Sequence, residues 1–480
     1  MWIGSLLAMG FAAYLGMAAY QAFKPLPPGL SVATPLREAG DIAFLVDGTY
    51  RDDTGARRFD QAIFDEVLAL VGQAERLVVI DMFLFNDFAG AAEGDDFRPL
   101  SGELAGALIR RKQERPDLTA VVISDPLNTL YGGLELEHFQ ALREAGVSVI
   151  LTDLTQQRAS NPAWSGLWHL CCRWLGNNSN GGWLPNALGP GKVTLRSYLN
   201  LLNFNANHRK TLVVDHGKRW VGLVTSANPH DASSRHGNVA LRFAGPTALD
   251  LLGTERAVAA MSGAGIDFPQ PDAMPGMVAP ASDEERALLQ VLTESKIRDA
   301  LLAAVASTKA GDRLDIAVFY FAHRPLVEAV MAAHRRGVSI RLLLDPNKDA
   351  FGLEKNGIPN RQVAHELHQA GIPVRWCDTQ GEQCHSKLLL KTAASGESEL
   401  ILGSANYTRR NLDDLNLETS VRLLADRRHS AIEDAGRFFE GHWHNRDRRH
   451  SSVDYAVFAD DSRLRYWQYR IMEASGLSTF

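Results

Sequence analysis

The sequence predicts an α/β protein built from two tandem α/β/α sandwich halves in a pseudo-twofold arrangement, preceded by one N-terminal transmembrane helix. Three observations predict this fold. The run from Trp2 to Phe23 has no charged side chain. After about residue 40, uniformly apolar strand-like segments alternate with segments of helical period. The order of these segments then occurs a second time.

The N-terminal apolar run has about the ~20 residues that a helix needs to cross a bilayer. Lys24 and the sequence PLPPG close it. A cleaved signal peptide is the alternative, but no Lys or Arg precedes the run and its end, AAYQAFK, is a poor cleavage site. We therefore expect an uncleaved, single-pass anchor. Lys24 and Arg37 follow the run, which favours a cytoplasmic position for the rest of the chain, although large domains cross membranes regardless of such charges.

The chain after the anchor repeats itself. The apolar segments 77–87 and 314–324 each follow a helix-period segment and end in polar residues. The next apolar segment of each half closes on an Asp-Pro turn, at Asp125 and Asp345. Strands this uniformly apolar have no wet face, so we expect helices to cover both sides of each sheet. Two such units in tandem predict a site at their interface.

The repeat also sets the predicted domain boundaries. A Pro/Gly/Ala-rich stretch marks the linker between the halves. The expected order is an anchor at 1–24, a linker at 25–40, a first half at 41–268, a linker at 269–283 and a second half at 284–480.

Only the first half holds an insertion, at 155–205, and it is rich in tryptophan. Tryptophans among Leu, Gly and Asn suit a water–lipid interface, where one edge of the ring is apolar and the other is wet. They equally suit a loop that packs on its own domain. Both interpretations apply to Trp164, Trp168, Trp174 and Trp183.

Each half carries a His-x-Lys pair. The first half has His208, Lys210 and Asp215 in NHRKTLVVD, and the second has His385 and Lys387 in CHSKLLLKT. Residues two apart on a strand point to the same face, so each imidazole projects beside an ammonium. Such a pair suits a phosphate, because Lys neutralises its oxygens while His attacks phosphorus or protonates a leaving oxygen.

A Ser-Ala-Asn triplet follows each pair, with Ser226 and Asn228 in the first half and Ser404 and Asn406 in the second. At strand ends these side chains can donate hydrogen bonds to the phosphate oxygens. Two copies facing each other would surround one phosphate with two imidazoles, two ammonium groups and two amides, which needs no metal. Two core histidines in a duplicated scaffold are the duller explanation, and they would not require both sets at matching spacing.

These segments resemble the two HKD motifs, H-x-K-x4-D followed by G-S-x-N, of the phospholipase D superfamily. The resemblance covers nearly all the chain after the anchor, and the order of anchor and two halves is similar to that of bacterial cardiolipin synthases and related phosphatidyltransferases. It implies catalysis by His208, Lys210, His385 and Lys387 without a cofactor or metal. One histidine would form a phosphohistidine, and the other would protonate the departing alcohol and then activate the acceptor. Water as acceptor gives hydrolysis, and an alcohol gives transphosphatidylation.

The chain departs from the family pattern behind the motifs. Thr392 replaces the Asp of the second motif, while Asp215 remains as a structural member of the first. The family tends to place a carboxylate behind each motif to orient its histidine. Glu418 fits this role for His385. Its counterpart by sequence is Ala240, which would leave the first histidine without such a partner.

The division of labour between the histidines stays open at this point. In the family that the chain resembles, the histidine of the first half is usually the nucleophile, which here would be His208. A carboxylate-backed imidazole is more basic and better oriented, which would favour His385. We take His208 as the nucleophile.

Composition narrows the substrate class. The net charge is -6, whereas proteins that bind polyphosphates such as nucleic acids usually have an excess of basic residues. Anchor, insertion and charge favour a membrane phospholipid as substrate, with an alcohol or water as acceptor. A metal-independent nuclease acting on DNA or RNA is the alternative, with basic clusters only at 110–112, 334–336 and 446–450. A non-catalytic scaffold is the third possibility, and both intact motif sets argue against it.

Four cysteines complete the inventory, and none forms a CxxC pair. Cys377 and Cys384 would form a loop disulfide in an oxidising compartment. So sparse a cysteine set favours two free thiols.

Overall fold

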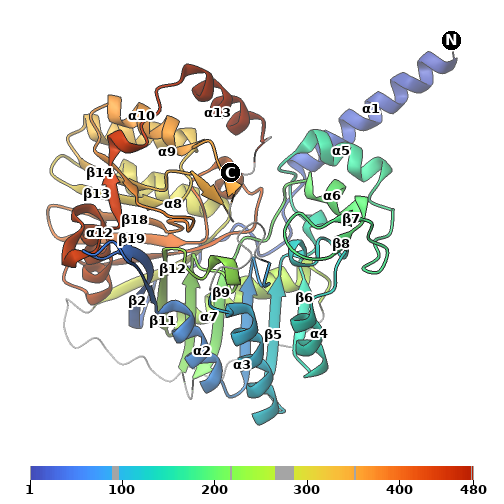
Figure 1. Ribbon diagram of the computed structural model, residues 1–480, viewed down its shortest axis with the longest axis horizontal. Helices are drawn as coiled ribbons and strands as arrows, with labels where there is room; N and C mark the ends of the chain where they lie inside the picture. The colour runs from blue at the N-terminus through green and yellow to red at the C-terminus, as the bar shows by residue number, and fades with distance from the viewer. Residues whose placement is uncertain are drawn as a thin grey trace.

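The computed structural model describes residues 2–88, 97–216, 219–264, 286–350, 353–476, 478 and 480. It contains two large mixed sheets, one in each predicted half (Figure 1). The expected linker at 269–283 lies outside the described residues.

The first sheet runs β3-β2-β11-β10-β9-β4-β5-β6. Its strands β4, β5 and β6 are parallel and the remaining neighbours are antiparallel. The elements of this half are β2 (Gly40–Arg51), β3 (Arg57–Gln61), α2 (Ile63–Gln73), β4 (Leu77–Met82), α3 (Leu100–Glu114), β5 (Thr119–Ser124), α4 (Glu137–Glu144), β6 (Ser148–Leu151), β9 (Lys210–His216), β10 (Arg219–Thr225), β11 (Asn238–Ala244) and α7 (Pro246–Met261).

The second sheet runs β1-β12-β20-β19-β18-β13-β14-β17-β21. From β12 to β17 its order matches that of the first sheet from β2 to β6, which confirms the predicted duplication. Its elements are β1 (Arg37–Glu38), β12 (Ala287–Thr293), α8 (Ser295–Ala306), β13 (Arg313–Val318), α9 (Arg324–Arg335), β14 (Ser339–Leu344), α10 (Asn360–Gln369), β17 (Val374–Cys377), β18 (Lys387–Thr392), β19 (Glu397–Gly403), α11 (Arg409–Leu412), β20 (Thr419–Asp426), α12 (Ser430–His444), β21 (Ser452–Asp454) and α13 (Arg463–Ser475).

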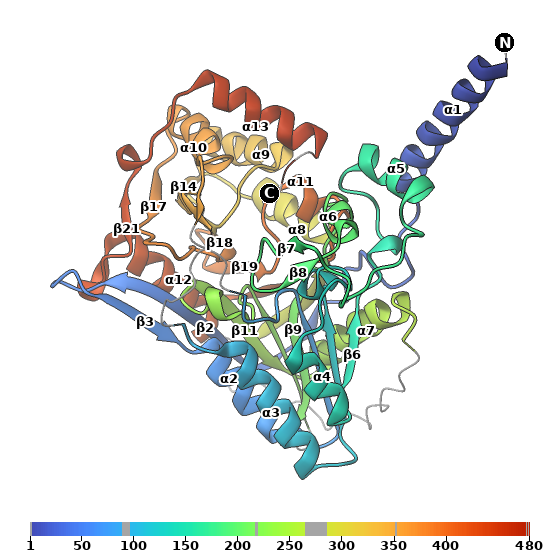
Figure 2. The same cartoon turned by 45° about the vertical axis from the view of Figure 1, so that its right-hand side comes forward.

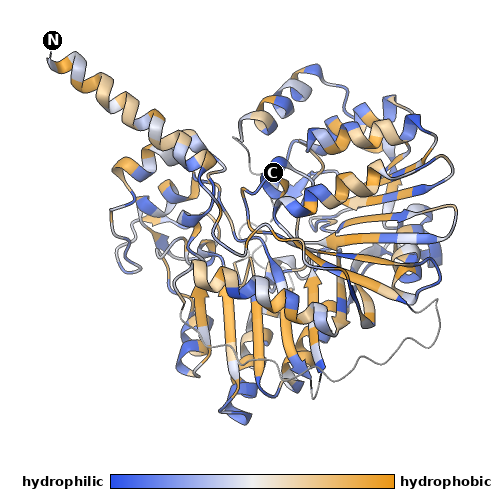
Figure 3. Cartoon of the chain, turned by 180° about the vertical axis from the view of Figure 1, so that it is seen from behind, coloured by the Kyte–Doolittle hydropathy of each residue, from blue (hydrophilic) through white to orange (hydrophobic). Residues whose placement is uncertain are grey.

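Three apolar cores hold these layers together. One lies between the first sheet and helices α2, α3 and α4, and another between the second sheet and helices α8, α9 and α10. The third is shared, since it combines the inner faces of both sheets with α7 and α12. The strands are apolar on both faces for this reason, as Figure 3 shows in orange. The expected covered α/β sheets and pseudo-twofold arrangement are confirmed.

The N-terminal run forms helix α1 (Trp2–Phe23), which projects from the body of the molecule (Figure 1). Among the described residues it is the one helix long and apolar enough to cross a membrane. The segment 25–40, expected as a linker, runs along the second half. There β1 pairs with β12, and the Val32 N–H donates to the Thr293 hydroxyl over 2.8 Å.

The insertion folds into α5 (Pro162–Cys171), the short pair β7 (Leu184–Pro185) and β8 (Lys192–Val193), and α6 (Leu195–Leu201). Helix α5 packs against the end of α1, where the Tyr14 hydroxyl donates to the Ala163 carbonyl over 3.1 Å. The insertion therefore forms the base from which α1 leaves the protein.

The expectation of free thiols at Cys377 and Cys384 is wrong, because the structure joins them with a sulfur–sulfur distance of 2.15 Å. The end of β17 and the residue before the second motif bring their Cα atoms to 6.2 Å. Sequence spacing alone does not reveal this approach. Cys171 and Cys172 are joined as neighbours at the end of α5.

Candidate active site

The two motifs meet where the halves exchange backbone hydrogen bonds. The His208 N–H donates to the Leu417 carbonyl over 2.8 Å. In the mirrored contact the His385 N–H donates to the Gly237 carbonyl over 2.7 Å. Each motif histidine is thus fixed to the backbone of the opposite half, and the two motifs lie together at the interface of the halves.

The two lysines occupy equivalent buried positions beneath the histidines. Lys210 Nζ donates to the His208 carbonyl over 2.7 Å, and Lys387 Nζ donates to the His385 carbonyl over 2.6 Å. Burial lowers the pKa of Lys210 to about 7. Burial, with the charge of Lys210 nearby, also places the pKa of Lys387 well below its usual range. A phosphate anion at this position would stabilise both ammonium groups.

An aromatic ring packs on each His-Lys pair. It follows the strand that lies beside β9 or β18 in the sheet. Phe83 follows β4, with its ring centroid 4.8 Å from that of His208 and 5.1 Å from Lys210 Nζ. Phe319 follows β13 and packs on the second pair in the same way, 5.1 Å from the ring of His385. These rings shield the lysines from water, which contributes to their lowered pKa values.

The comparison of the two halves by sequence predicted that Glu418 orients His385, and this prediction is wrong. The Glu418 carboxylate lies 2.9 and 3.1 Å from Nδ1 of His208, which belongs to the other half. The reason is the exchange of backbone bonds: Leu417 accepts from the His208 N–H, so the next side chain reaches the same imidazole. The hydroxyl of Ser404 and the amide of Asn411 donate to this carboxylate and fix it.

The residue that holds His385 is Asn238, whose Oδ1 lies 3.1 Å from Nδ1 of the ring. Ala240, the counterpart of Glu418 by sequence, has no such contact, because the segment from Ser226 to its partner Asn238 is two residues shorter than the segment from Ser404 to Glu418. The hydroxyl of Ser226 donates to Asn238 over 2.9 Å, just as Ser404 donates to Glu418. The two histidines therefore have different partners, a carboxylate and a neutral amide.

Ser226 and Ser404 have no exposed surface. Their hydroxyls donate to Asn238 and Glu418, the partners of the two histidines. Of the residues predicted to contact phosphate, the two asparagines of the triplets are therefore the ones placed to do so. Asn228 and Asn406 line the central cavity. Asn228 Oδ1 accepts from the Leu84 N–H over 3.2 Å, which leaves its amide nitrogen for a ligand.

Both imidazoles are neutral in the free site. Burial lowers the pKa of His208 to about 4, even though the Glu418 carboxylate opposes this shift. Burial and the Lys387 ammonium place the pKa of His385 well below its usual range. A neutral imidazole whose Nδ1–H is held by an acceptor presents the lone pair of Nε2, the form required of a nucleophile or base.

The cavity between the histidines has a volume of about 210 Å³. Its lining contains cationic, amide and aromatic side chains and no carboxylate among the described residues. It is lined by Phe83, Leu84, Ala206, His208, Asn228, Ser233, His236, Phe319, Tyr320, Lys355, Gln383, His385, Asn406, Arg410, Asn411 and Asn416. The arrangement suits a phosphodiester anion between two imidazoles.

Two positioning residues were seen in the sequence only as turn signals. Asp125 accepts from the Asn207 N–H over 2.6 Å, and Asp345 accepts from the Cys384 N–H over 2.8 Å. Each aspartate thus holds the residue that precedes a motif histidine. Burial raises the pKa of Asp125 to about 7 and that of Asp345 to about 6. Their matched places in the two halves were the signal that could have revealed this role.

Asp215 lies away from the cavity, at the far end of β9. Its carboxylate accepts from the backbone N–H groups of Arg76 and Leu77 over 2.9 and 2.8 Å. It therefore fixes the start of β4, in keeping with a structural role. Thr392 ends β18 and pairs there with Arg313.

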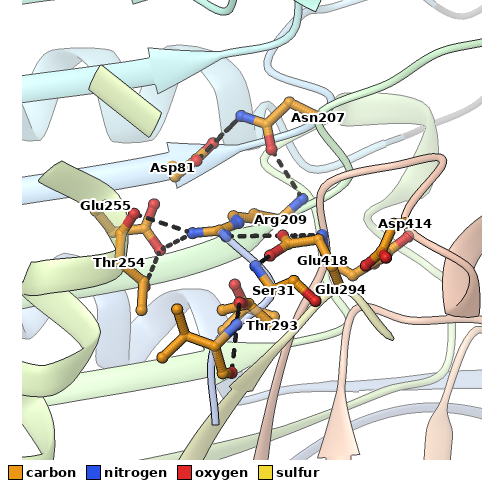
Figure 4. A network of polar contacts seen from close by, with 12 residues as sticks. Ser31, Asp81, Asn207, Arg209, Thr254, Glu255, Thr293, Glu294, Asp414 and Glu418 are labelled. Carbon is orange, nitrogen blue, oxygen red and sulfur yellow. Dashed lines mark hydrogen bonds and ion pairs between the residues drawn. The ribbon is translucent and has the colours of Figure 1, made fainter. Parts of the chain in front are cut away.

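A buried polar network lies on the opposite face of the first motif (Figure 4). Arg209, between His208 and Lys210, points away from the cavity and pairs with Glu294 at 2.8 Å and Glu255 at 3.5 Å. Glu294 also accepts from the Glu418 N–H over 3.2 Å. Asn207 donates to Asp81 over 2.8 Å. This network ties the first motif to the segment of the second half that carries the carboxylate of the site.

The comparisons with known proteins agree with this geometry. Residues 301–443 match the family model described as cardiolipin synthase, PLD-like domain. No curated protein sequence matches the chain. The solved structure of phosphatidylserine synthase from Haemophilus influenzae Rd KW20 has a similar fold, with a TM-score of 0.55 at 10% identity over 96% of this chain and 98% of that chain.

Two other solved structures overlap more weakly and do not bear on the fold. Polyphosphate kinase from Porphyromonas gingivalis gives a TM-score of 0.46 at 11% identity, over 91% of this chain and 53% of that chain. Nuc from Salmonella typhimurium, a phospholipase D family member, gives 0.26 at 21% identity, over 34% of this chain and 97% of that chain.

Two HKD segments converge on one cavity, and the second half matches a phospholipase D-like family model. The fold of a phosphatidylserine synthase extends over nearly the whole chain. Residues 301–443 therefore form a phospholipase D-like domain, and the chain as a whole shares its fold with a phosphatidylserine synthase.

Proposed function

We propose that this protein transfers or hydrolyses the phosphatidyl group of a membrane phospholipid through a covalent phosphohistidine on His208. The observation that carries the proposal is the pairing of unlike imidazoles across one cavity free of acidic lining residues. Family habit and geometry now agree on the nucleophile, because the carboxylate of Glu418 faces His208. The His208 Nε2 attacks phosphorus while Glu418 stabilises the positive charge that develops on the ring.

His385 acts on the oxygens that leave and enter. When the phosphodiester anion binds, its charge raises the pKa of His385, which takes up a proton. The protonated ring gives that proton to the headgroup alcohol as the bond between phosphorus and the leaving oxygen breaks. The neutral ring then takes a proton from the acceptor, whose oxygen attacks the phosphohistidine and frees His208. Water yields phosphatidic acid, and an alcohol yields a new phospholipid.

Lys210, Lys387, Asn228 and Asn406 bind the nonbridging oxygens through these steps. Charge-assisted donors in a buried cavity of low dielectric constant stabilise the pentacoordinate transition state more strongly than they would in solution. No step in this scheme draws on a cofactor.

The surface around the insertion supports a lipid substrate. Trp168 is buried and Trp164 donates to the Leu199 carbonyl, so these two rings pack on their own domain. Trp174 and Trp183 are 69% and 66% exposed. Each of the two interpretations of the tryptophan cluster thus applies to two of its members, and the exposed pair lies in the insertion that packs against α1.

Helix α13 presents a second exposed apolar stripe. Leu464, Trp467 and Ile471 lie three and four residues apart, on one face of the helix, and are 80%, 62% and 64% exposed. Both views place α1, the insertion and α13 at the same end of the molecule (Figures 1 and 2). Tryptophan and large aliphatic side chains gathered beside an apolar helix suit the interfacial layer of a bilayer. We propose that this end contacts the inner membrane of a bacterium.

The nuclease alternative has weaker support. The cluster at 446–450 is neutralised, since three of its arginines pair with carboxylates: Arg446 with Glu440, Arg448 with Asp53, and Arg449 with Asp60. A groove that follows a nucleic-acid backbone needs unpaired basic side chains.

One comparison tests the proposed function. Purified full-length protein would be given phosphatidylglycerol vesicles and, separately, single-stranded DNA, both with chelator. We expect lipid turnover that His208→Asn and His385→Asn both abolish. Adding glycerol or ethanol would identify transfer by the headgroup of the product. DNA cleavage without lipid turnover would contradict the proposal, and a trapped phosphohistidine at His385 would contradict the assigned nucleophile.

A further inference from the structure

The catalytic cavity contains a cation that the phosphoryl-transfer chemistry does not use. Arg410 lies on α11, four residues after Asn406, and its side chain lines the cavity together with both histidines. Its Nη2 atom is buried and has no hydrogen-bond partner in the described part of the chain. No described carboxylate pairs with it.

Two arginines elsewhere in the chain have their charges matched. Arg209 pairs with Glu255 and Glu294, and Arg341 with Asp315 and Glu440. An unmatched buried charge is costly, because no counter-ion replaces the water that the group has lost.

Arg410 packs against an aromatic ring and remains a cation despite its burial. Its guanidinium lies 5.3 Å from the ring centroid of Phe204. Burial lowers its pKa only to about 10, so the group remains a cation at neutral pH. Lys355 lines the same cavity, where its Nζ donates to the Tyr320 hydroxyl over 2.7 Å. Two cations thus lie near the catalytic centre in addition to Lys210 and Lys387.

A comparison of the two halves indicates that the arginine at this position is present on one side of the cavity. Arg410 follows Asn406 by four residues, and the residue four after Asn228 is Ala232. The phosphoryl group itself is handled by groups that occur in both halves. A cation present in one half only therefore fits a group that lies on one side of the scissile phosphate.

Arg410 also faces the end of the molecule that carries the exposed apolar side chains. It borders a small hollow lined by Ser160 of the insertion, Glu473 of α13 and Phe480. Glu473 forms no ion pair with it among the described residues. Arg410 thus lines both the catalytic cavity and a hollow bordered by α13, on the side of the proposed membrane-facing surface.

We propose that Arg410, with Lys355 beside it, forms an anion subsite next to the catalytic centre. It would bind a second acidic group, a phosphate or carboxylate, carried by the headgroup of the donor lipid or by the acceptor. This inference rests on the proposed lipid function and specifies its substrate class. The planar guanidinium suits two parallel hydrogen bonds to such a group.

The test compares ligands that differ by one anionic group. As acceptors with phosphatidylglycerol vesicles, glycerol is compared with glycerol 3-phosphate. As donors, phosphatidylglycerol is compared with phosphatidylglycerol phosphate. We expect Arg410→Gln to lower kcat/KM by about 30- to 1000-fold for the more anionic member of at least one pair. For the less anionic member the loss should stay under about threefold, since the catalytic groups are intact.

The arm that shows the selective loss identifies the source of the second anion. Lys355→Gln should give a smaller loss with the same selectivity. Arg409→Gln is the matched control, because that guanidinium donates to the Ala474 carbonyl. Equal losses for both members of each pair, or no loss in either pair, would overturn the subsite.

A readout without lipid separates failure of the subsite from failure of the proposed function. Hydrolysis of bis(4-nitrophenyl) phosphate reports the catalytic centre, and propane-1,3-diyl bisphosphate and propyl phosphate serve as inhibitors. We expect the wild-type protein to prefer the bisphosphate and Arg410→Gln to lose that preference. If this result holds while no lipid is turned over, the subsite stands and the lipid substrate does not. An unchanged preference in the variant would contradict the subsite under either function.

Discussion

The unlike partners of the two histidines lead to unequal effects of removing them. Glu418→Gln replaces a carboxylate with a neutral amide of the same shape, in contact with Nδ1 of His208 at 2.9 Å. Asn238→Ala removes a neutral hydrogen bond of 3.1 Å to His385. If His208 is the nucleophile, the first change acts where positive charge develops during attack on phosphorus.

The size of the effect follows from the geometry. At 2.9 Å and an effective dielectric constant of about 20, an imidazolium and a carboxylate attract each other by about 6 kcal/mol. If half of the charge has developed in the transition state, about 3 kcal/mol is lost, or roughly 150-fold in kcat. The glutamine oxygen still accepts a hydrogen bond, so the ring keeps its orientation. A neutral hydrogen bond contributes about 1 kcal/mol, so Asn238→Ala should cost roughly fivefold.

The assay is single-turnover phosphoenzyme formation with phosphatidylglycerol vesicles, alongside steady-state kcat. Thermal unfolding of each variant checks that the fold is kept, and Glu418→Asp tests whether charge alone restores part of the rate. Phosphoenzyme formation should slow more than its hydrolysis in Glu418→Gln. Equal losses in Glu418→Gln and Asn238→Ala would refute the argument, as would a Glu418→Gln enzyme that retains more than a tenth of the wild-type rate.

Three further outcomes are expected. Burial lowers the pKa of His208 to about 4 and that of Lys210 to about 7, and a bound anion raises both. Tungstate should therefore bind with uptake of at least one proton near pH 7 and more tightly as pH falls from about 8 to about 5; calorimetry in buffers of different ionisation enthalpy would show no uptake if this is wrong. Trp467→Glu should lower vesicle binding and activity on vesicles about tenfold but leave bis(4-nitrophenyl) phosphate hydrolysis unchanged, whereas Phe59→Glu, on the distant β3, should change neither. Arg209→Met leaves two buried carboxylates without a cation and should lower the free energy of unfolding by about 3–5 kcal/mol in chemical denaturation; a variant as stable as the wild type would contradict this.

Much of the fold could be predicted because the two halves are equivalent. Local periodicity identified the strands, and the repeat then showed which strands correspond. The same comparison brought together both His-Lys pairs, because residues two apart on a strand share a face whatever the tertiary context. Asp125 and Asp345 were visible in the sequence, but a turn signal does not reveal that the carboxylates hold the residues before His208 and His385.

The partner of each histidine could not be predicted for a physical reason. Spacing within a half places Glu418 behind a motif, but it does not say which half that side chain faces. The exchange of backbone hydrogen bonds between the halves decides this, and it depends on tertiary packing. Arg410 was missed because an arginine in a helix is ordinary by composition, and its lack of a counter-ion is visible only in three dimensions.

The reciprocal backbone bonds at His208 and His385 have a consequence for inheritance. Each half positions the motif histidine of the other half. A sequence change at these contacts in one half therefore impairs the site residues of the other. A chain of this kind behaves as a fused homodimer whose two copies must evolve together. Its halves can diversify only at positions that make no contact with the opposite half. Glu418 and Asn238 lie at this contact, and under the proposed mechanism an exchange of the acid and the amide would give the carboxylate to His385 and favour it as the nucleophile.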